Sequence, residues 1–237
     1  MFSPTLPALN IISILLVDDH SLVRAGIARM LADEADMQVI AELSTGEQAI
    51  DFVRSTECIP DLVLMNARMP GMGGVEATRA LLETYPDIKV VAMSSVVSGI
   101  IPSQMLRAGA QAFKFKNKEI VDILKANRMV CAGQHYVSQD AATHLALDPF
   151  NKEAQALFEK LSRREMQIAQ MLTDGKKVSQ ISHYLELSPK TVYSYRYRIF
   201  EKLGIYSDLE LTILAIKHGL TEDSQGLKHL PQINAAG

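Results

Sequence analysis

Polar residues with chemically useful side chains follow four short apolar runs in the first half of the chain. They are two carboxylates (Asp18 and Asp19), an amide (Asn66), a hydroxyl (Ser94, followed by Ser95) and an ammonium group (Lys116). Each has an ordinary explanation, because the end of a strand meets solvent and is often polar. Together they indicate one polar site, provided that the fold brings the ends of these runs to one place.

The apolar runs are typical of buried strands in an α/β domain. We expect strands at residues 12–17, 38–43, 62–65, 90–93 and 112–115, which are short and rich in Val, Ile and Leu without strict alternation. Helical patterns occur near residues 22–32, 47–55, 75–84, 102–108 and 119–131. Five such units predict a doubly wound, five-stranded parallel sheet. In such sheets ligands bind at the carboxyl ends of the strands, which is where the polar groups stand.

Residues 162–203 carry the start and stop signals of three helices. Ser162 and Glu165 have the spacing of a capping box, and the helix that they begin should end at Asp174. A second helix is expected near residues 178–185. After a three-residue turn, Ser188 and Pro189 stand at the cap and the first position of a third helix. The second and third helices therefore predict a helix-turn-helix in an all-α domain.

The third helix has two different faces. At about 100° per residue, one side carries Val192, Tyr195, Ile199 and Leu203, with Arg196 at its edge, and the other carries Lys190, Tyr193, Ser194, Tyr197 and Glu201. The second side suits the major groove of DNA, where hydrogen-bonding side chains reach base edges. Arg198 and Lys202 flank it and suit contacts with phosphates. The alternative is an ordinary surface helix with two exposed tyrosines.

Composition restricts the class of protein. The 237 residues are 48% hydrophobic and 22% charged, which allows two domains with buried cores. No apolar run reaches the roughly 20 residues that span a bilayer, and no signal peptide or membrane is expected. Cys58 and Cys131 lack metal-ligand spacing, which favours a reduced, cytoplasmic protein. The net charge is −3, yet residues 176–202 hold six basic and two acidic residues, a modest footprint for nucleic-acid binding.

Four segments, LLVDDHSLVRAGI, DLVLMNARMPGMGGVEATR, VVAMSS and AFKFK, resemble the receiver domain of bacterial response regulators. The resemblance implies that Asp18 and Asp19 bind Mg²⁺. It also implies that Ser94 and Lys116 hold the oxygens of a phosphoryl group, which a histidine kinase would supply. By the same resemblance, Phe113 is the switch aromatic.

Asn66 stands where that family has the aspartate that accepts the phosphoryl group. An amide is neither anionic nor nucleophilic enough to form an acyl phosphate, and it is a weaker ligand for a hard cation. We therefore expect a receiver that is not phosphorylated at Asn66, requires no cofactor and binds Mg²⁺ weakly at Asp18 and Asp19. The asparagine is either natural, which the unusual neighbours Ala67 and Arg68 favour, or engineered.

The segment LSRREMQIAQMLTDGKKVSQISHYLELSPKTVYSYRYRIFEKLGI resembles the four-helix DNA-binding domain of LuxR, NarL and FixJ regulators. SPKTVYSYRYRIFEKL and DLELTILAIKHGL are similar to the GacA/UvrY subgroup. The resemblance places Thr191, Tyr193, Ser194 and Tyr197 toward DNA. In relatives the fourth helix forms the dimer contact. Leu211, Leu214 and Ala215 have the apolar spacing for that contact or for the core of the domain.

These patterns predict a receiver domain at residues 1–132, a linker at 133–156, a LuxR-type helix-turn-helix domain at 157–220 and a tail at 221–237. The leading hypothesis is a homodimeric transcriptional regulator, not an enzyme, that binds double-stranded DNA and has a sensor histidine kinase as its partner. The alternative is a decoy that pairs with a phosphorylatable relative or occupies its kinase, which Asn66 supports. A flavodoxin-like enzyme is disfavoured, because the chain has no GxGxxG turn or nucleophile elbow.

Overall fold

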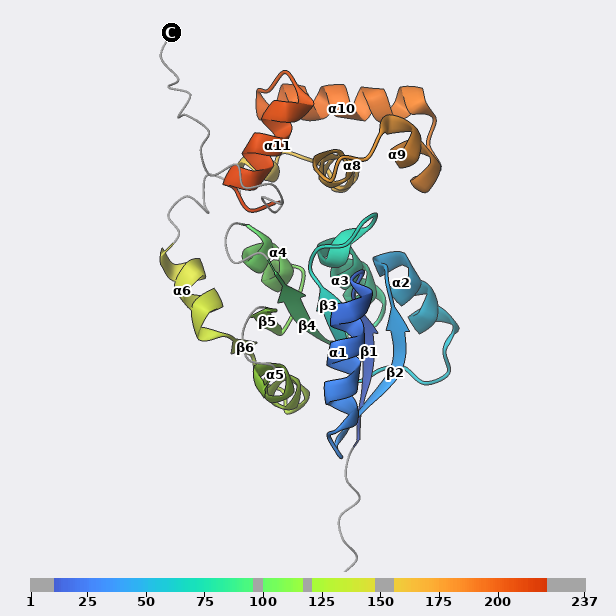
Figure 1. Cartoon of the computed structure of the whole chain (residues 1–237), viewed down its shortest axis with the longest axis vertical. Coiled ribbons are helices and arrows are strands. Elements are labelled where there is room, and N and C mark those ends of the chain that lie inside the picture. Colours follow the sequence, from blue (N-terminus) through green and yellow to red (C-terminus); the bar gives the residue numbers. More distant parts are fainter. Residues whose placement is uncertain (1–10, 96–99, 117–120, 148–155, 221–237) are drawn as a thin grey trace, which may run out of the picture.

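The computed structural model describes residues 11–95, 100–116, 121–147 and 156–220. They form an α/β domain and a smaller helical domain, which lie against one another (Figure 1). Both predicted fold classes are therefore present. Among the described residues, no helix combines the length and the apolar character needed to cross a bilayer.

A six-stranded parallel sheet forms the centre of the α/β domain. Its strands are β1 (Ile12–Val17), β2 (Met37–Leu43), β3 (Leu62–Asn66), β4 (Lys89–Ser94), β5 (Ala112–Phe115) and β6 (Tyr136–Val137). The order across the sheet is β2-β1-β3-β4-β5-β6, and every neighbouring pair is parallel. The strand order reverses between β1 and β3, and in such sheets ligands bind beyond the carboxyl ends of the strands at this point.

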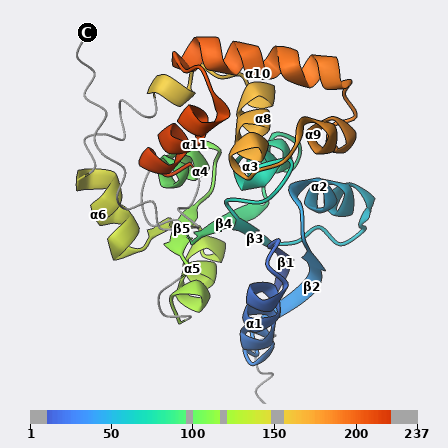
Figure 2. The ribbon, with the colours of Figure 1, turned by 45° about the horizontal axis from the view of Figure 1, so that its top comes forward.

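Helices cover both faces of this sheet. α1 (Ser21–Ala32) and α5 (Val121–Cys131) cover one face, and α2 (Gly46–Ser55), α3 (Gly73–Thr84) and α4 (Ile101–Arg107) cover the other (Figure 2). Residues of β1 alternate between the two apolar layers: Ile14 and Leu16 join α1 and α5, whereas Leu15 and Val17 join α2, α3 and α4. Burial on both faces explains why the strands are continuous apolar runs.

The sixth strand was not predicted. β6 pairs with β5 at Ala112 and Phe113, and α6 (Gln139–Leu147) follows it and buries Ala141 near β5 and α4. A two-residue strand is too short to show a period, so the sequence indicated only a partly ordered linker. Residues 136–147 instead extend the edge of the α/β domain.

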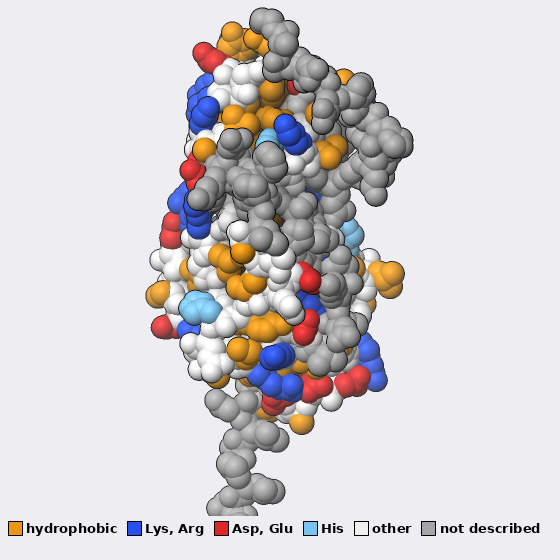
Figure 3. Space-filling model, turned by 90° about the vertical axis from the view of Figure 1, so that its left-hand side faces the viewer, with side chains coloured by type: hydrophobic (Ala, Val, Ile, Leu, Met, Phe, Trp, Pro, Cys, Tyr) orange, Lys and Arg blue, Asp and Glu red, His pale blue; other side chains and the backbone are white. Residues whose placement is uncertain are grey.

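On the side of the molecule shown in Figure 3, charged side chains of both signs lie among apolar ones.

The helical domain consists of α8 (Arg163–Thr173), α9 (Val178–Tyr184), α10 (Pro189–Leu203) and α11 (Asp208–Lys217). The predicted capping box is confirmed: Ser162 Oγ accepts from the Glu165 N–H, and the Glu165 carboxylate accepts from the Ser162 N–H. Ser188 and Ser207 cap α10 and α11 through their side-chain oxygens. Local capping chemistry therefore sets the start of three of these helices.

Ion pairs and apolar contacts connect the two domains. The ion pairs join Arg68 with Asp174, Arg107 with Glu159, and Arg163 with both Glu76 and Glu83. The apolar layer over α2, α3 and α4 continues into the helical domain through residues such as Phe158 and Ile168. The N–H of Ile100 also donates to the carbonyl of His218 at 3.2 Å. The helical domain is thus held near the carboxyl ends of the strands.

Candidate functional site

The polar groups at the carboxyl ends of β1, β3, β4 and β5 lie at one edge of the sheet. Asp18 and Ser94 are fully buried, and Asn66 is 3% exposed. Lys116 Nζ donates to Asp18 Oδ2 at 2.5 Å, and the Lys116 N–H donates to the Ser94 carbonyl at 2.7 Å. Phe113 is also fully buried, within the layer that faces α4. The fold therefore assembles the site from strands that are far apart in the sequence.

The Asn66 side chain donates hydrogen bonds to acidic oxygens. Its Nδ2 lies 2.8 Å from Asp19 Oδ1, 3.4 Å from Asp18 Oδ1 and 2.7 Å from the carbonyl oxygen of Arg68. A carboxylate at this position would have no hydrogen to donate. Asn66 thus brings a donor to a place where the receiver family has a third anionic group.

Donors already surround the two carboxylates that would bind a metal ion. Asp18 Oδ1 accepts from the His20 N–H at 2.9 Å and its Oδ2 accepts from Lys116, while Asp19 Oδ1 accepts from Asn66. Mg²⁺ requires oxygen ligands at about 2.0–2.1 Å in near-octahedral geometry. The ion would have to displace the amide from Asp19, so the residues as arranged do not fit it. Weak Mg²⁺ binding at Asp18 and Asp19 stays a prediction.

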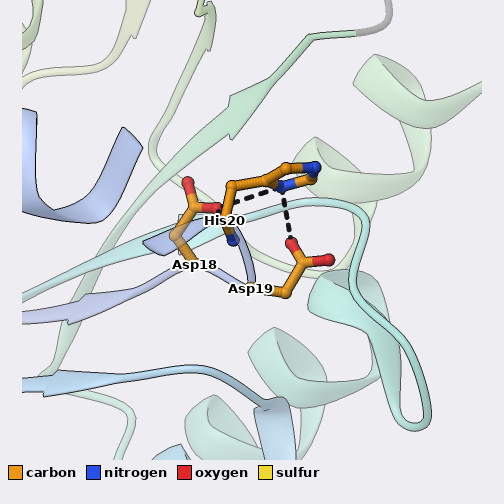
Figure 4. A group of neighbouring side chains, drawn as sticks. All are labelled: Asp18, Asp19 and His20. Carbon is orange, nitrogen blue, oxygen red and sulfur yellow. Dashed lines mark hydrogen bonds and ion pairs between the residues drawn. The ribbon is translucent and has the colours of Figure 1, made fainter. Parts of the chain in front are cut away.

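His20 is a member of this cluster that received no role from the sequence. Its Nδ1 lies 3.0 Å from Asp19 Oδ1 and 3.5 Å from Asp18 Oδ1 (Figure 4). Its place directly after the acidic pair was the available signal. The histidine side chain is 64% exposed, so it closes the solvent side of the cluster without being buried in it.

The two faces of α10 differ in burial as the sequence predicts. Val192 and Ile199 are fully buried, whereas Tyr193 is 56% and Tyr197 is 73% exposed. Lys190, Ser194, Arg198 and Glu201 are exposed too, and Thr191 is half-buried. The helix lies on the side of its domain away from the sheet (Figure 1). Its outward face is therefore available to a partner.

The cations beside this face have different partners. Arg198 lies over the Tyr195 ring at 4.5 Å and donates to the Ser194 carbonyl at 3.3 Å. Lys202 Nζ instead donates to Glu165 at 2.7 Å, on a carboxylate that is 3% exposed. Burial raises the pKa of Glu165, but hydrogen bonds from Lys202 and Ser162 outweigh this effect and lower it below its ordinary value. Lys202 thus has a structural role that the sequence did not reveal.

The apolar residues of α11 divide between core and surface. Leu211 and Ala215 are fully buried, and Leu214 is half-buried against the same core. The alternative left open by their spacing is therefore decided in favour of the core for the first two. Tyr206, just before the helix, and Leu209, in its first turn, are strongly exposed.

Comparison with known families agrees with both domains. Residues 14–128 match the response regulator receiver domain, and residues 159–215 match the bacterial regulatory proteins of the luxR family. The response regulator GacA of Pseudomonas viridiflava is 48% identical over 214 residues, which are 90% of this chain and 99% of GacA. The chain is a response regulator. The response regulator UvrY of Escherichia coli K12 is 45% identical over 210 residues, 88% of this chain and 95% of UvrY.

One solved structure matches both domains, and a second matches a little over half of the chain. RcsB from Salmonella enterica serovar Typhimurium, bound to promoter rprA in the presence of phosphomimetic BeF3⁻, has a TM-score of 0.61 at 19% identity, over 86% of this response regulator and 98% of RcsB. A LuxR-family response regulator from Aurantimonas sp. SI85-9A1 has a TM-score of 0.55 at 28% identity, over 58% of this chain and 97% of that one. A receiver joined to a LuxR-type DNA-binding domain thus describes the molecule.

Proposed function

We propose that this response regulator binds specific double-stranded DNA sequences through the outward face of α10, as a transcriptional regulator whose receiver is not phosphorylated at Asn66. The difference in burial between the two faces of α10 is the observation that supports DNA binding. Its buried side attaches the helix to the domain, while Tyr193, Ser194 and Tyr197 remain exposed on the other side. A helix held in this way can enter the major groove without loss of packing.

The side chains of this face suit base and phosphate contacts. The hydroxyls of Ser194 and the two tyrosines can donate or accept hydrogen bonds at base edges. Arg198 is exposed and positively charged, which suits a phosphate beside the groove. We therefore expect sequence specificity from the central side chains and general DNA affinity from the flanking cations.

The chemistry at Asn66 supports a receiver that does not form an acyl phosphate there. Acyl phosphate formation needs a carboxylate oxygen that attacks phosphorus, and an amide is a poor nucleophile. Lys116, which the receiver family uses toward phosphoryl oxygens, is bound to Asp18 here. The acidic pair is likewise occupied by Asn66 and His20.

The partners follow from this function. We expect a homodimer that binds an inverted repeat. Tyr206, just before α11, and Leu209, in its first turn, are exposed and available for a subunit contact. A sensor histidine kinase is the expected partner of the receiver. The alternative function, a decoy that occupies such a kinase or pairs with a phosphorylatable relative, is favoured by Asn66 and needs no DNA contact.

DNA binding is tested on the full chain. Duplexes are selected from a random pool, and affinities for selected and random duplexes are compared by fluorescence anisotropy. We expect Tyr193→Ala to weaken binding to the selected duplex and to leave binding to random duplexes nearly unchanged. Leu22→Ala, at an 85% exposed side chain on α1, is the control and should bind like the parent. Equal affinity of the parent for selected and random duplexes would favour the decoy.

Phosphorylation is tested by intact mass. Incubation with acetyl phosphate and Mg²⁺ should leave the mass of the parent unchanged. Asn66→Asp should gain one labile phosphoryl group, since Asp18, Asp19, Ser94 and Lys116 remain to assist. A phosphoryl adduct of the parent that maps to this pocket would contradict the proposal.

A further inference from the structure

The amide of Asn66 occupies the centre of the acidic pocket with a fixed orientation. Its two hydrogens face three oxygens, those of Asp19, Asp18 and the Arg68 carbonyl. A rotated amide would place Oδ1 against the same three acceptors, which is repulsive, so the network itself determines which atom points inward. The uncharged amide therefore bridges the acidic groups through hydrogen bonds, as a bound cation would bridge them through its charge.

The bond from Asn66 to the Arg68 carbonyl holds the beginning of loop 67–73, which consists of the residues between β3 and α3 and the first residue of α3. The Arg68 guanidinium forms an ion pair with Asp174, at the end of α8 in the DNA-binding domain, and both side chains are only 23% exposed. An ion pair that is largely shielded from solvent is less screened than one on the surface. The loop thus begins in the acidic pocket and continues directly into the contact between the domains.

A second contact follows three residues later. Gly71 has φ +81°, and a Cβ placed there would lie 2.2 Å from Tyr184 Oη, so the loop backbone passes close to the tyrosine at the end of α9. Glu47 connects the two elements: it accepts from the Met72 N–H at 2.9 Å and from the Tyr184 hydroxyl at 3.3 Å. The position of the loop and the position of the DNA-binding domain are therefore linked.

We propose that Asn66 replaces the divalent cation of the receiver pocket and holds loop 67–73 in the conformation that binds the DNA-binding domain. The contact between the domains is then independent of both metal and phosphorylation. With Asp in place of Asn66, a third carboxylate would face Asp18 and Asp19 without the amide hydrogens between them. Lys116 and the His20 N–H contact Asp18, so the new carboxylate would meet Asp19 and the Arg68 carbonyl in place of the lost amide bonds, and repulsion would displace the loop unless a cation entered. The proposal does not depend on DNA binding, so its test and the tests of the proposed function can fail separately.

Hydrogen–deuterium exchange of the full chain tests this, in EDTA and in excess Mg²⁺, without DNA or phosphoryl donor. The parent should exchange equally in both conditions at residues 67–73 and in the peptide that contains Tyr184. Asn66→Asp should exchange at least about tenfold faster at both places in EDTA, which corresponds to about 1.4 kcal/mol, and Mg²⁺ should restore the protection. Parent protection that needs Mg²⁺, or an Asn66→Asp variant protected in EDTA, overturns the proposal.

Two further variants keep the test decisive. Asn66→Ala removes the donor without adding a charge, so exchange at both places should rise and Mg²⁺ should not restore it. This variant replaces Asn66→Asp in the test if Asn66→Asp does not fold, and protection equal to that of the parent would then overturn the proposal.

Gly71→Ala leaves the pocket intact and clashes with Tyr184. It should increase exchange around Tyr184 to the same extent in EDTA and in Mg²⁺, and a response to Mg²⁺ would contradict the assignment.

Discussion

Removal of Lys202 tests how α10 is attached to its domain. Its Nζ lies 2.7 Å from the Glu165 carboxylate, which is 3% exposed, while the lysine side chain is 38% exposed. Breaking a fully buried ion pair costs about 3–5 kcal/mol. Here water reaches the ammonium group, and the Ser162 N–H still donates to the carboxylate. We therefore expect Lys202→Ala to lower the free energy of unfolding by about 1–2 kcal/mol.

The assay is urea denaturation of the full chain, followed by circular dichroism, for Lys202→Ala, Glu165→Gln and the double variant. Once Glu165 is neutral, removal of Lys202 should cost less than about 0.5 kcal/mol more. Arg198→Ala is the matched control, because this exposed cation on the same helix contacts the Tyr195 ring and a backbone carbonyl. It should change stability by no more than about 0.5 kcal/mol.

The same ion pair predicts a dependence on pH. The folded-state pKa of Glu165 is lowered, so the contribution of the pair is fully present above its ordinary pKa of 4.5 and is lost as the pH falls through the lower folded value. The cost of Lys202→Ala should accordingly shrink below pH 4.5. An equal cost in the Glu165→Gln background, or an unchanged cost at acidic pH, refutes the reasoning.

Three other predictions concern the same surfaces. Tyr197→Ala should weaken specific DNA binding by about 1–3 kcal/mol, measured by titration, and leave stability unchanged. Ile199→Ala should lower the free energy of unfolding by about 2–5 kcal/mol. Equal thermal melting of the two variants would contradict this difference. Arg198→Ala should lower the slope of log affinity against log salt concentration by about one unit. Lys202→Ala should lower this slope by less, because Glu165 offsets the charge of Lys202. Equal slopes of the two variants in salt titrations would contradict this prediction. Burial and the charge of Glu47 raise the pKa of Tyr184 to about 12. The contact of Tyr184 with the receiver should thus persist below pH 10 and be lost as the pH rises toward 12. Tyr184→Phe should remove one tyrosine step near pH 12 from an absorbance titration.

The sequence predicted the parts of the fold that have local causes. Strands buried on both faces must be continuous apolar runs, and all five predicted strands are present. The starts of α8, α10 and α11 also have a local cause. In each, the side-chain oxygen of a nearby serine accepts a hydrogen bond from a free N–H group of the first turn. The convergence of Asp18, Asn66 and Lys116 followed from topology, because parallel strands end at the same edge.

Features that depend on distant residues were not predictable in this way. Arg68 and Asp174 are 106 positions apart, and no local pattern announces their ion pair. Lys202 was assigned to phosphates from its place on the helix, although its partner Glu165 lies on α8, 37 positions earlier. Asn66 was interpreted as the loss of a carboxylate, whereas the three-dimensional structure also shows the gain of a donor. In each case the partner, not the residue type, decides the role.

The contact between the domains limits what the receiver can control. It uses α8 and the residues before it, the end of α9 and the end of α11. It leaves the outward face of α10 exposed, with Tyr193 at 56% and Tyr197 at 73%. Because this face is already exposed in this arrangement, the receiver cannot control DNA binding by covering and uncovering α10. The contact does constrain the orientation of the DNA-binding domain. In the proposed dimer, two α10 helices must meet half-sites about 34–36 Å apart. A change at loop 67–73 would thus alter DNA binding through that spacing, with every residue that contacts DNA left intact.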